Sequence, residues 1–342
     1  MIRRVPRRYL SLVTLLIILG LIAPLPYVLV EPGTPTNTFG KEKGKPVLEI
    51  FGQKVYPTNG KLNLTSISVT SPNSRLQSFE LLRAWIDGER SVQPREVFYS
   101  RDVDPKKVNE ENAREMKNSQ INAQLAALNN LEIKYSLRLV IENFREKSPN
   151  KKVLKKGDQV ISFEGTRINS SKELRKALTN TQSKEVDLGV IRGGKQMVIP
   201  ITISKQKIGE VEKNFIGLYI SEKYDLPFKV TLNLKNIGGP SAGLVFALTI
   251  IDKITEEDLI RGRNIAGTGT ISPIGEVGPI GGIEGKLIGA GRAGVTLFLA
   301  PALNCSEIRH TPRGLQVVPV DTLTEALAAL RERNRERLPT CG

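Results

Sequence analysis

A long uncharged run near the amino terminus decides where the rest of the chain folds. Leu10–Val30 contains 21 residues without a charged side chain, and four arginines precede it. A helix rises about 1.5 Å per residue, so such a run spans a hydrocarbon core about 30 Å thick. Because arginines favour the cytoplasmic side, residues 1–30 are predicted to be a basic cytoplasmic tip and an uncleaved single-pass anchor in the cell membrane, with the bulk of the chain extracellular. A cleaved signal peptide is the alternative, but no small-x-small pattern stands before Pro24.

Residue composition excludes several kinds of chemistry. The single histidine, His310, rules out a site that needs two histidines, and two cysteines rule out a four-thiolate cluster. No GxxxxGK[ST] phosphate-binding loop occurs, so neither an ATP-driven motor nor a cofactor is expected. The net charge of +15 is concentrated in residues 138–208, with 16 basic and 7 acidic side chains. With only 5% aromatic residues to stack on bases, this excess favours a membrane surface or a solvated face, and no nucleic-acid partner is expected.

The two cysteines bear on the compartment. Disulfides persist in oxidising surroundings outside the cytoplasm. On an exported chain, Cys305 and Cys341 therefore form a possible disulfide that would tie the end of the chain to its last domain. Two unrelated thiols are the alternative.

Changes in pattern divide the exported part into three predicted domains, and the fold class is α/β or α+β. Residues 31–135 combine short β-like runs and Pro–Gly turns with one long polar helix, for which Asp104 is the expected N-cap. Residues 136–208 alternate as strands around one helix and a Gly–Gly hairpin turn. Residues 209–342 alternate strand and helix signals over a longer stretch, which is typical of a domain with its own core.

The strand–helix–hairpin order of residues 136–208 carries a family resemblance. The positions that carry it are Ser148-Pro149, Leu154, Gly157-Asp158, Val160, Gly165, Ile168 and Arg192. In this pattern the segment resembles a PDZ domain of the bacterial protease-associated kind. The resemblance implies that an extended peptide, often its C-terminal end, binds as an added strand. The loop for the peptide carboxylate is expected just before Leu137, near Tyr135 and Ser136.

A glycine-rich turn at residues 238–243 holds the main candidate for chemistry. Its sequence is Gly-Gly-Pro-Ser-Ala-Gly, and it stands between a predicted strand and an apolar helix, so that Ser241 can present its hydroxyl at a helix N-terminus. A serine that merely caps the helix is the plain alternative. A nucleophilic serine needs a base. Lys286, at the start of a small-residue helix, would become one if burial lowered its pKa from about 10.4, whereas His310 stands in a basic, solvated context.

Three motifs in the last region carry a second resemblance. They are the turn around Ser241, the stretch Gly267–Ile271, and Pro279–Gly282 followed by Lys286. Together they resemble the proteolytic domain of Lon proteases, and the whole chain resembles the membrane-anchored, PDZ-containing Lon-like proteases of Gram-positive bacteria. The resemblance implies an ATP-independent serine endopeptidase that acts on peptides or unfolded proteins at the cell surface.

The same resemblance implies the roles of individual residues. Ser241 would be the nucleophile and Lys286 the general base, with Thr268 orienting the lysine and Gly239, Pro240 and Ala242 shaping the turn. Lon-type domains assemble into rings, so a homo-oligomer is possible. The chain departs from Lon proper at Gly238, where an acidic residue is usual, and it lacks the ATPase module.

Two hypotheses from other classes stay open at this point. One is an α/β-hydrolase-like esterase that uses Ser241 with His310, because Gly239–Gly243 also fits the GxSxG pattern. The other is a non-catalytic, membrane-tethered adaptor that recruits partners through the PDZ segment. Loss of activity on substitution of Lys286 would favour the protease, and loss on substitution of His310 would favour the esterase. If substitution of Ser241 left the biological function intact, the adaptor would be favoured.

Overall fold

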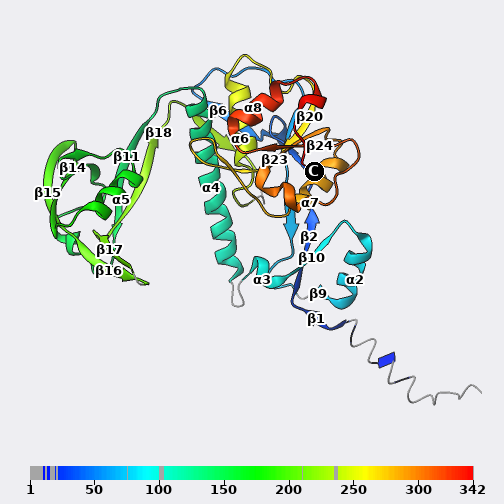
Figure 1. The fold of residues 1–342 in the computed structure, drawn as a ribbon, viewed down its shortest axis with the longest axis horizontal. Coiled ribbons are helices and arrows are strands. Elements are labelled where there is room, and N and C mark those ends of the chain that lie inside the picture. The colour runs from blue at the N-terminus through cyan, green and yellow to red at the C-terminus, as the bar shows by residue number, and fades with distance from the viewer. Residues whose placement is uncertain are drawn as a thin grey trace, which may run out of the picture. The chain divides into compact units, whose positions relative to one another are not determined.

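The computed structural model divides the chain into two compact units (Figure 1). Unit 1 joins residues 1–133 to residues 228–342, and unit 2 contains residues 134–227. The structure describes residues 22–74, 76–99, 104–209, 211–234 and 238–341, together with positions 11, 14, 15 and 20.

Unit 1 is built from helices and many short strands. Its helices are α2 (Ser78–Asp87), α3 (Arg95–Phe98), α4 (Pro105–Asn130), α6 (Gly243–Ile254), α7 (Ile283–Arg292) and α8 (Leu323–Arg331), with 3-10 turns at Ala302–Glu307 and Arg335–Arg337. Its strands are β1 (Pro24–Leu25), β2 (Tyr27–Pro32), β3 (Thr36–Asn37), β4 (Lys41–Glu42), β5 (Lys45–Pro46), β6 (Leu48–Phe51), β7 (Lys61–Leu64), β8 (Ile67–Val69), β9 (Leu76–Gln77), β10 (Ser91–Pro94), β19 (Lys229–Leu232), β20 (Asn264–Gly267), β21 (Thr270–Ile271), β22 (Val277–Gly278), β23 (Leu297–Pro301) and β24 (Gln316–Val320).

The central sheet of unit 1 has the strand order β24-β23-β20-β7-β3. The first four strands are parallel, and β3 is antiparallel to β7. All five residues of β23 are buried, as expected of a parallel strand covered on both faces. Because β7 comes from residues 61–64 and pairs with β20, residues 31–133 and 228–341 share one core. They are not the two separate domains that the sequence predicts.

Two helices bring the amino-terminal and carboxy-terminal parts of unit 1 together. Helix α6 is buried at every position except Lys253, because its sequence is almost entirely apolar. Helix α4 packs against it and buries Ala123 and Leu125–Leu128. The Asp104 side chain accepts a hydrogen bond from Lys106 N, 2.9 Å away, and Pro105 opens the helix, which confirms the predicted start.

A three-stranded sheet of order β10-β2-β8 lies beside the central sheet. Its middle strand, β2, contains the end of the predicted membrane anchor, and Val28–Val30 are buried there. The predicted carboxy-terminal boundary of the anchor is therefore wrong, since uncharged residues suit a buried strand as well as a membrane. The rest of the predicted anchor lies largely outside the described residues. Among the described residues, the structure has no helix with the length and hydropathy to cross a bilayer.

Unit 2 is a sheet that one helix covers. The sheet has the order β15-β14-β12-β11-β18, and β13 pairs with β12. Its elements are β11 (Ser136–Phe144), β12 (Gln159–Phe163), β13 (Thr166–Arg167), β14 (Glu185–Arg192), β15 (Lys195–Thr202), β16 (Ser204–Ile208), β17 (Val211–Phe215), β18 (Leu218–Asp225), α5 (Ser171–Asn180) and a 3-10 turn at Pro149–Lys152. Unit 2 therefore extends past residue 208, the predicted end of this domain, because β18 pairs with β11 along its whole length.

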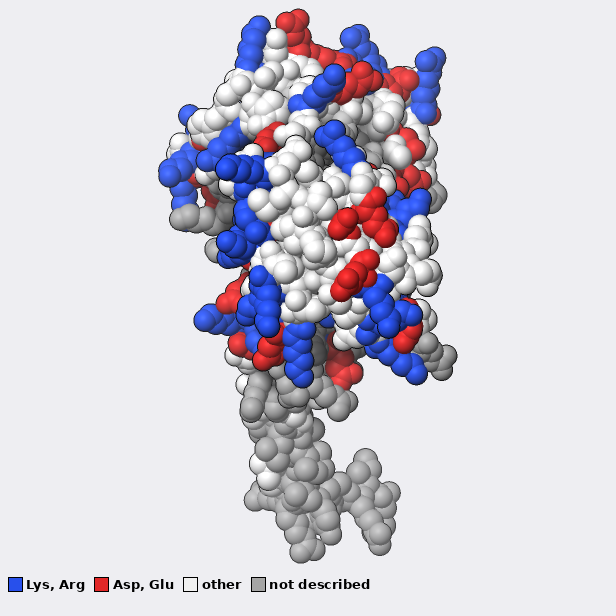
Figure 2. All heavy atoms as spheres, turned by 90° about the vertical axis from the view of Figure 1, so that its left-hand side faces the viewer, with Lys and Arg blue, Asp and Glu red and all other residues white. Residues whose placement is uncertain are grey.

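The core and the surface of unit 2 follow from its alternating strands. Inward-facing residues such as Leu139, Ile141, Leu188 and Val190 form one apolar cluster with α5. Outward-facing residues carry most of the charge. Figure 2 shows both basic and acidic side chains on the face that it draws.

Candidate active site

The turn that carries Ser241 is held by helix α4. Gly239 N donates to Asn112 O at 3.2 Å, and Ser119 Oγ donates to Pro240 O at 2.9 Å. A Cβ on Gly238 would approach Asn112 Cβ to 2.8 Å, so only glycine fits there. Gly239 has a φ of +82°, which also favours glycine. The polar residues of α4 therefore fix the backbone of the turn, a role that its sequence alone does not indicate.

Ser241 precedes α6 but does not cap it. The N-cap residue is Ala242, and no side chain caps this helix end. Instead, the Ser241 carbonyl oxygen accepts hydrogen bonds from Gly269 N at 2.8 Å and from Thr268 Oγ1 at 3.1 Å. The capping alternative for this serine is thus wrong, and its hydroxyl is available for other chemistry. Among the described residues, the N–H groups of Ser241 and Ala242 donate to no protein acceptor.

Lys286 lies in the first turns of α7 and is almost completely buried. Its residue surface is 2% exposed, and Nζ donates to Thr268 Oγ1 at 3.0 Å. Gly282, with a φ of +70°, is the N-cap residue of α7. Within the described part of the chain, no carboxylate forms a salt bridge with this amine. Because burial disfavours the charged form, the pKa of Lys286 falls from 10.5 to about 7.

Thr268 connects the lysine to the serine turn. Its hydroxyl accepts a hydrogen bond from Lys286 Nζ and donates its own proton to the Ser241 carbonyl oxygen. Thr268 itself is 0% exposed and follows β20 directly, so its position is set by the central sheet. Three residues that are far apart in sequence are therefore brought to one place by β20, α6 and α7.

Ser241 and Lys286 line the same cavity, which has a volume of about 410 Å³. The other walls are Gly33, Thr65–Ser68, Asn112, Glu115, Met116, Gly238–Pro240, Ala242 and Gly281. The wall from α4 and the stretch around β8 were not predicted from the sequence, because no local motif marks either of them. Within the described residues, Ser241 Oγ forms no direct hydrogen bond with Lys286 Nζ; the amine is bonded to Thr268 instead.

His310 does not belong to this site. It lies in the segment that follows the 3-10 turn at Ala302–Glu307, is exposed, and is not among the residues that line the cavity. The same region holds a disulfide between Cys305 and Cys341. The bridge fixes the described end of the chain to the domain that carries the lysine helix.

Two of the residues predicted to bind a peptide in the second domain begin strand β11 and are paired with another strand. Ser136 and Leu137 pair with Asp225 and Tyr224 of β18, so this end of β11 offers no free edge on that side. Strand β18 itself is one of the two border strands of the sheet. A groove of about 350 Å³ separates it from α5, lined by Leu174, Leu178, Phe215–Ile220 and neighbouring polar residues. The stretch Phe215–Leu218 was missed, because it lay beyond the predicted domain boundary.

Comparison with known proteins matches two stretches of the chain to known domain types. Residues 225–332 match the model of the Lon protease (S16) C-terminal proteolytic domain, and residues 107–203 match that of the PDZ domain. The chain carries a Lon-type proteolytic domain and a PDZ domain. Ser241, Thr268 and Lys286 all lie within the first match.

Several curated Lon proteases are similar over this region. Lon protease 2 of Herpetosiphon aurantiacus is 35% identical over 128 residues, which are 36% of this chain and 15% of that protein. Lon protease 1 of Myxococcus xanthus is 34% identical over 137 residues, which are 38% of this chain and 16% of that protein. The chain thus spans less than a fifth of the length of these relatives.

A solved structure resembles part of the chain. The PDZ domain of the SdrC-like protein from Listeria monocytogenes is 18% identical, covers 24% of this chain and 85% of that chain, and has a TM-score of 0.22. The assignment of the PDZ domain therefore rests on the family match and on the topology of unit 2.

Proposed function

We propose that this chain is an ATP-independent serine endopeptidase in which Ser241 is the nucleophile and Lys286 the general base. The observation that carries the proposal is a buried lysine, with a pKa of about 7, in the same cavity as a serine that caps no helix. Near neutral pH about half of such amines are uncharged, and an uncharged amine can accept a proton.

The proposed mechanism is acyl transfer in two halves. The Ser241 side chain rotates toward Lys286, and Oγ attacks the peptide carbonyl carbon while Nζ takes the hydroxyl proton. The lysine then gives this proton to the leaving amine. Water attacks the resulting ester with Lys286 again as the base, which regenerates the serine. The N–H groups of Ser241 and Ala242, which have no acceptor among the residues that the structure describes, are proposed to stabilise the oxyanion, and Thr268 to position Nζ.

The proposed substrates are flexible peptides or unfolded proteins. Because this sequence contains no phosphate-binding loop, we propose that cleavage does not depend on ATP-driven unfolding. The groove between β18 and α5 is suited to an extended segment, because β18 is a border strand and Leu174 and Leu178 provide an apolar wall. We propose that the PDZ domain captures or senses such segments there.

We also propose that the segment before β1 anchors the chain in a membrane, with the disulfide on the outer, oxidising side. The uncharged run after four arginines supports this, as does helix α2. Its outward side is apolar, with Phe79, Leu82, Trp85 and Ile86 between 47% and 78% exposed. Strand β1 pairs with β9, which α2 follows directly, so this surface lies where the anchor segment enters unit 1 (Figure 1).

Trp85 is the only tryptophan of the chain, so its fluorescence tests the anchoring. Tryptophan is enriched at membrane–water interfaces. The emission of the full chain should shift to the blue when vesicles are added, and it should be quenched in vesicles that contain brominated lipids relative to unbrominated ones. Unquenched emission, or burial of Trp85 by a second copy of the chain without any vesicles, would contradict this part of the proposal.

The protease proposal is tested by two substitutions and one matched control. The full chain should cleave an unstructured protein without nucleotide, and Ser241→Ala and Lys286→Met should each abolish cleavage. Lys253→Met is the control, since Lys253 is a half-buried lysine on α6 whose pKa burial also lowers but which lies outside the cavity. Normal turnover by Lys286→Met would remove the proposal, and dependence on His310 would favour the esterase instead.

A further inference from the structure

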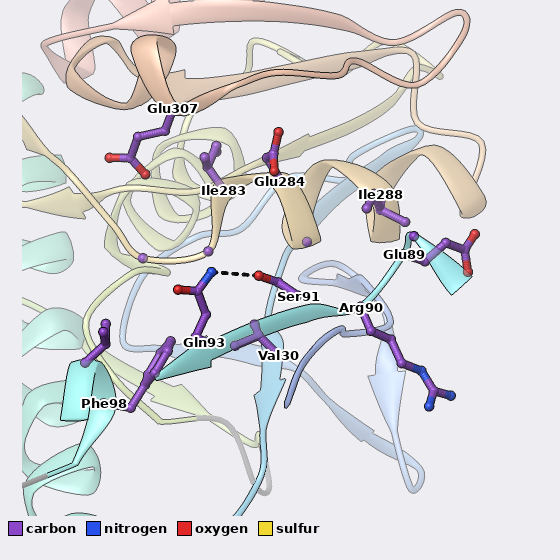
Figure 3. A pocket seen from close by; sticks show the side chains of 15 residues that line it. Val30, Glu89, Arg90, Ser91, Gln93, Phe98, Ile283, Glu284, Ile288 and Glu307 are labelled. Carbon is purple, nitrogen blue, oxygen red and sulfur yellow. Dashed lines mark hydrogen bonds between the residues drawn. The ribbon is translucent and has the colours of Figure 1, made fainter. Parts of the chain in front are cut away.

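A second, larger cavity adjoins the one that holds Ser241 and Lys286. It has a volume of about 600 Å³ and lies between the start of α7 and strand β10 (Figure 3). The residues that line it come from β2, from residues 88–98, from α7 and its preceding glycines, and from Glu307. A volume of this size is enough for more than one amino-acid side chain. None of the residues proposed for the reaction lies in this cavity.

The wall formed by β10 and α3 is apolar with a small polar strip. Val97 and Phe98 are 67% and 36% exposed, which is unusual for large apolar residues that line a hollow. Ser91 and Gln93 point to the same face of β10 and hydrogen-bond to each other at 2.7 Å, as the dashed line in Figure 3 marks. The alternate residue, Val92, packs against the apolar cluster of α2 on the opposite face.

Most of the charged residues around this cavity have partners, and Glu307, for which the described residues form no salt bridge, accepts a hydrogen bond from Asn304 Nδ2 at 2.9 Å. Arg90 forms salt bridges with Glu31 and Asp87, and Glu89 pairs with Arg292. Figure 3 shows the Glu284 carboxylate pointing away from β10, and it accepts a hydrogen bond from Arg309 N. With these charges compensated or turned aside, an apolar group is the occupant that the cavity suits.

Gly281 connects this cavity to the candidate active site. It lines both cavities, and a Cβ placed on it would meet nothing within 4 Å. Gly281 therefore lies at the border that the two cavities share. The backbone at this position has room for a Cβ, so a side chain introduced there would start at this border.

The β10–α3 wall lies outside both matched families. Residues 88–98 precede the PDZ match at 107–203 and the Lon match at 225–332. We propose that this cavity binds a large apolar side chain of the substrate segment next to the cleaved bond, and that Val97 and Phe98 select for it. This inference rests on the proposed function, since it places substrate at Ser241.

The test uses a series of fluorogenic peptides that contain only serine, alanine and glycine apart from one phenylalanine, which is placed at a different position in each peptide. For the full chain, one position of phenylalanine should raise kcat/KM about tenfold over serine at the same place. In Val97→Ser/Phe98→Ser and in Gly281→Leu this ratio should fall to about one. Leu303→Ser is the control, because Leu303 is 66% exposed in the same unit and lines neither cavity.

A binding measurement separates this inference from the proposed function. The same peptides, labelled for fluorescence anisotropy, are titrated into the Ser241→Ala chain with and without the Val97→Ser/Phe98→Ser pair. Loss of the positional preference in the pair supports the inference, whether or not the parent chain cleaves. The same preference in both proteins, or none in either, overturns it. Failure of the parent chain to cleave any peptide would count against the protease alone.

Discussion

Lys286 in unit 1 and Asp158 in unit 2 are both nearly inaccessible to water, at 2% and 1% exposed, but their surroundings differ. Asp158 is paired with Arg192, with 2.6 Å between Arg192 Nη2 and Asp158 Oδ2, and it also accepts from Lys155 N at 2.7 Å. Among the described residues, Lys286 has only the neutral hydroxyl of Thr268 as a side-chain partner. Burial alone would raise the pKa of Asp158, but these hydrogen bonds lower it, whereas burial acts unopposed on Lys286.

The difference separates a structural role from a reactive one. A buried charge with a well-placed partner stays ionised and fixes the elements that carry it, here the turn at Gly157 and the hairpin end at Arg192. A buried amine without a counter-ion gives up its proton near neutral pH, at a cost to stability. This comparison supports a reactive role for Lys286 in unit 1 and a structural role for the Asp158–Arg192 pair, which stabilises the fold of unit 2.

Replacing the lysine should give the largest effect. Lys286→Met should lower kcat/KM about 10³-fold or more, since it removes the proposed base. It should also raise the free energy of unfolding, by about 4–5 kcal/mol at pH 6, because an unpaired ammonium no longer has to be buried. Peptide cleavage and urea denaturation measure the two effects. A variant that is inactive but less stable would mean that the lysine is mainly structural.

Replacing the aspartate should change stability in the opposite direction. Asp158→Asn leaves Arg192 without its charged partner, and breaking a buried pair costs about 3–5 kcal/mol. The Arg192 side chain is 25% exposed, so water compensates part of this, and we expect about 2 kcal/mol. Asp225→Asn is the control, because its partner Arg138 and Asp225 itself are about half exposed. Hydrogen exchange of β12 and β14 would report the loss, and equal effects of the two variants would contradict the comparison.

Local patterns predicted the site better than they predicted the sheets. The turn around Ser241, the segment of Thr268 and the start of α7 are each marked by glycines and small residues, so their elements are recognisable one at a time. The pairing of β7 with β20 joins residues some 200 positions apart, and neither strand carries a mark of its partner. For the same reason, β18 was placed in the wrong domain. The end of the uncharged run was assigned to the membrane because uncharged residues fit a membrane helix and a buried strand such as β2 equally well.

The two buried groups should also respond to different ranges of pH. The pKa of Lys286 is about 7 in the folded chain and 10.5 when solvated, so between these values the unfolded chain binds more protons. Stability should then rise with pH across this window, by about 1.4 kcal/mol per unit, relative to Lys286→Met. The lowered pKa of Asp158 makes its contribution constant there and lost only in acid. Parallel curves for the full chain and Lys286→Met between pH 7 and 10 would contradict a buried, neutral amine.

The smallest predicted effect tests how Thr268 serves the lysine. Thr268→Val keeps the shape but removes the acceptor for Lys286 Nζ and the donor to the Ser241 carbonyl. We expect kcat to fall about fivefold to tenfold with little change in KM, because the amine loses its position and the substrate pocket does not. Thr268→Ser should restore most of the rate, since its hydroxyl can make both bonds.

The pH profile decides whether Thr268 acts through the lysine. In Thr268→Val the buried amine loses a hydrogen-bond acceptor that favours its charged form. The apparent pKa in the pH profile of kcat/KM should therefore move below the parent value of about 7. A merely structural threonine would lower activity at every pH alike and leave this pKa in place. Thr268 is the only hydrogen-bond partner of Nζ among the described residues. A shift of the pH profile in Thr268→Val would therefore show that the lysine takes part in the reaction, without any substitution of the lysine itself.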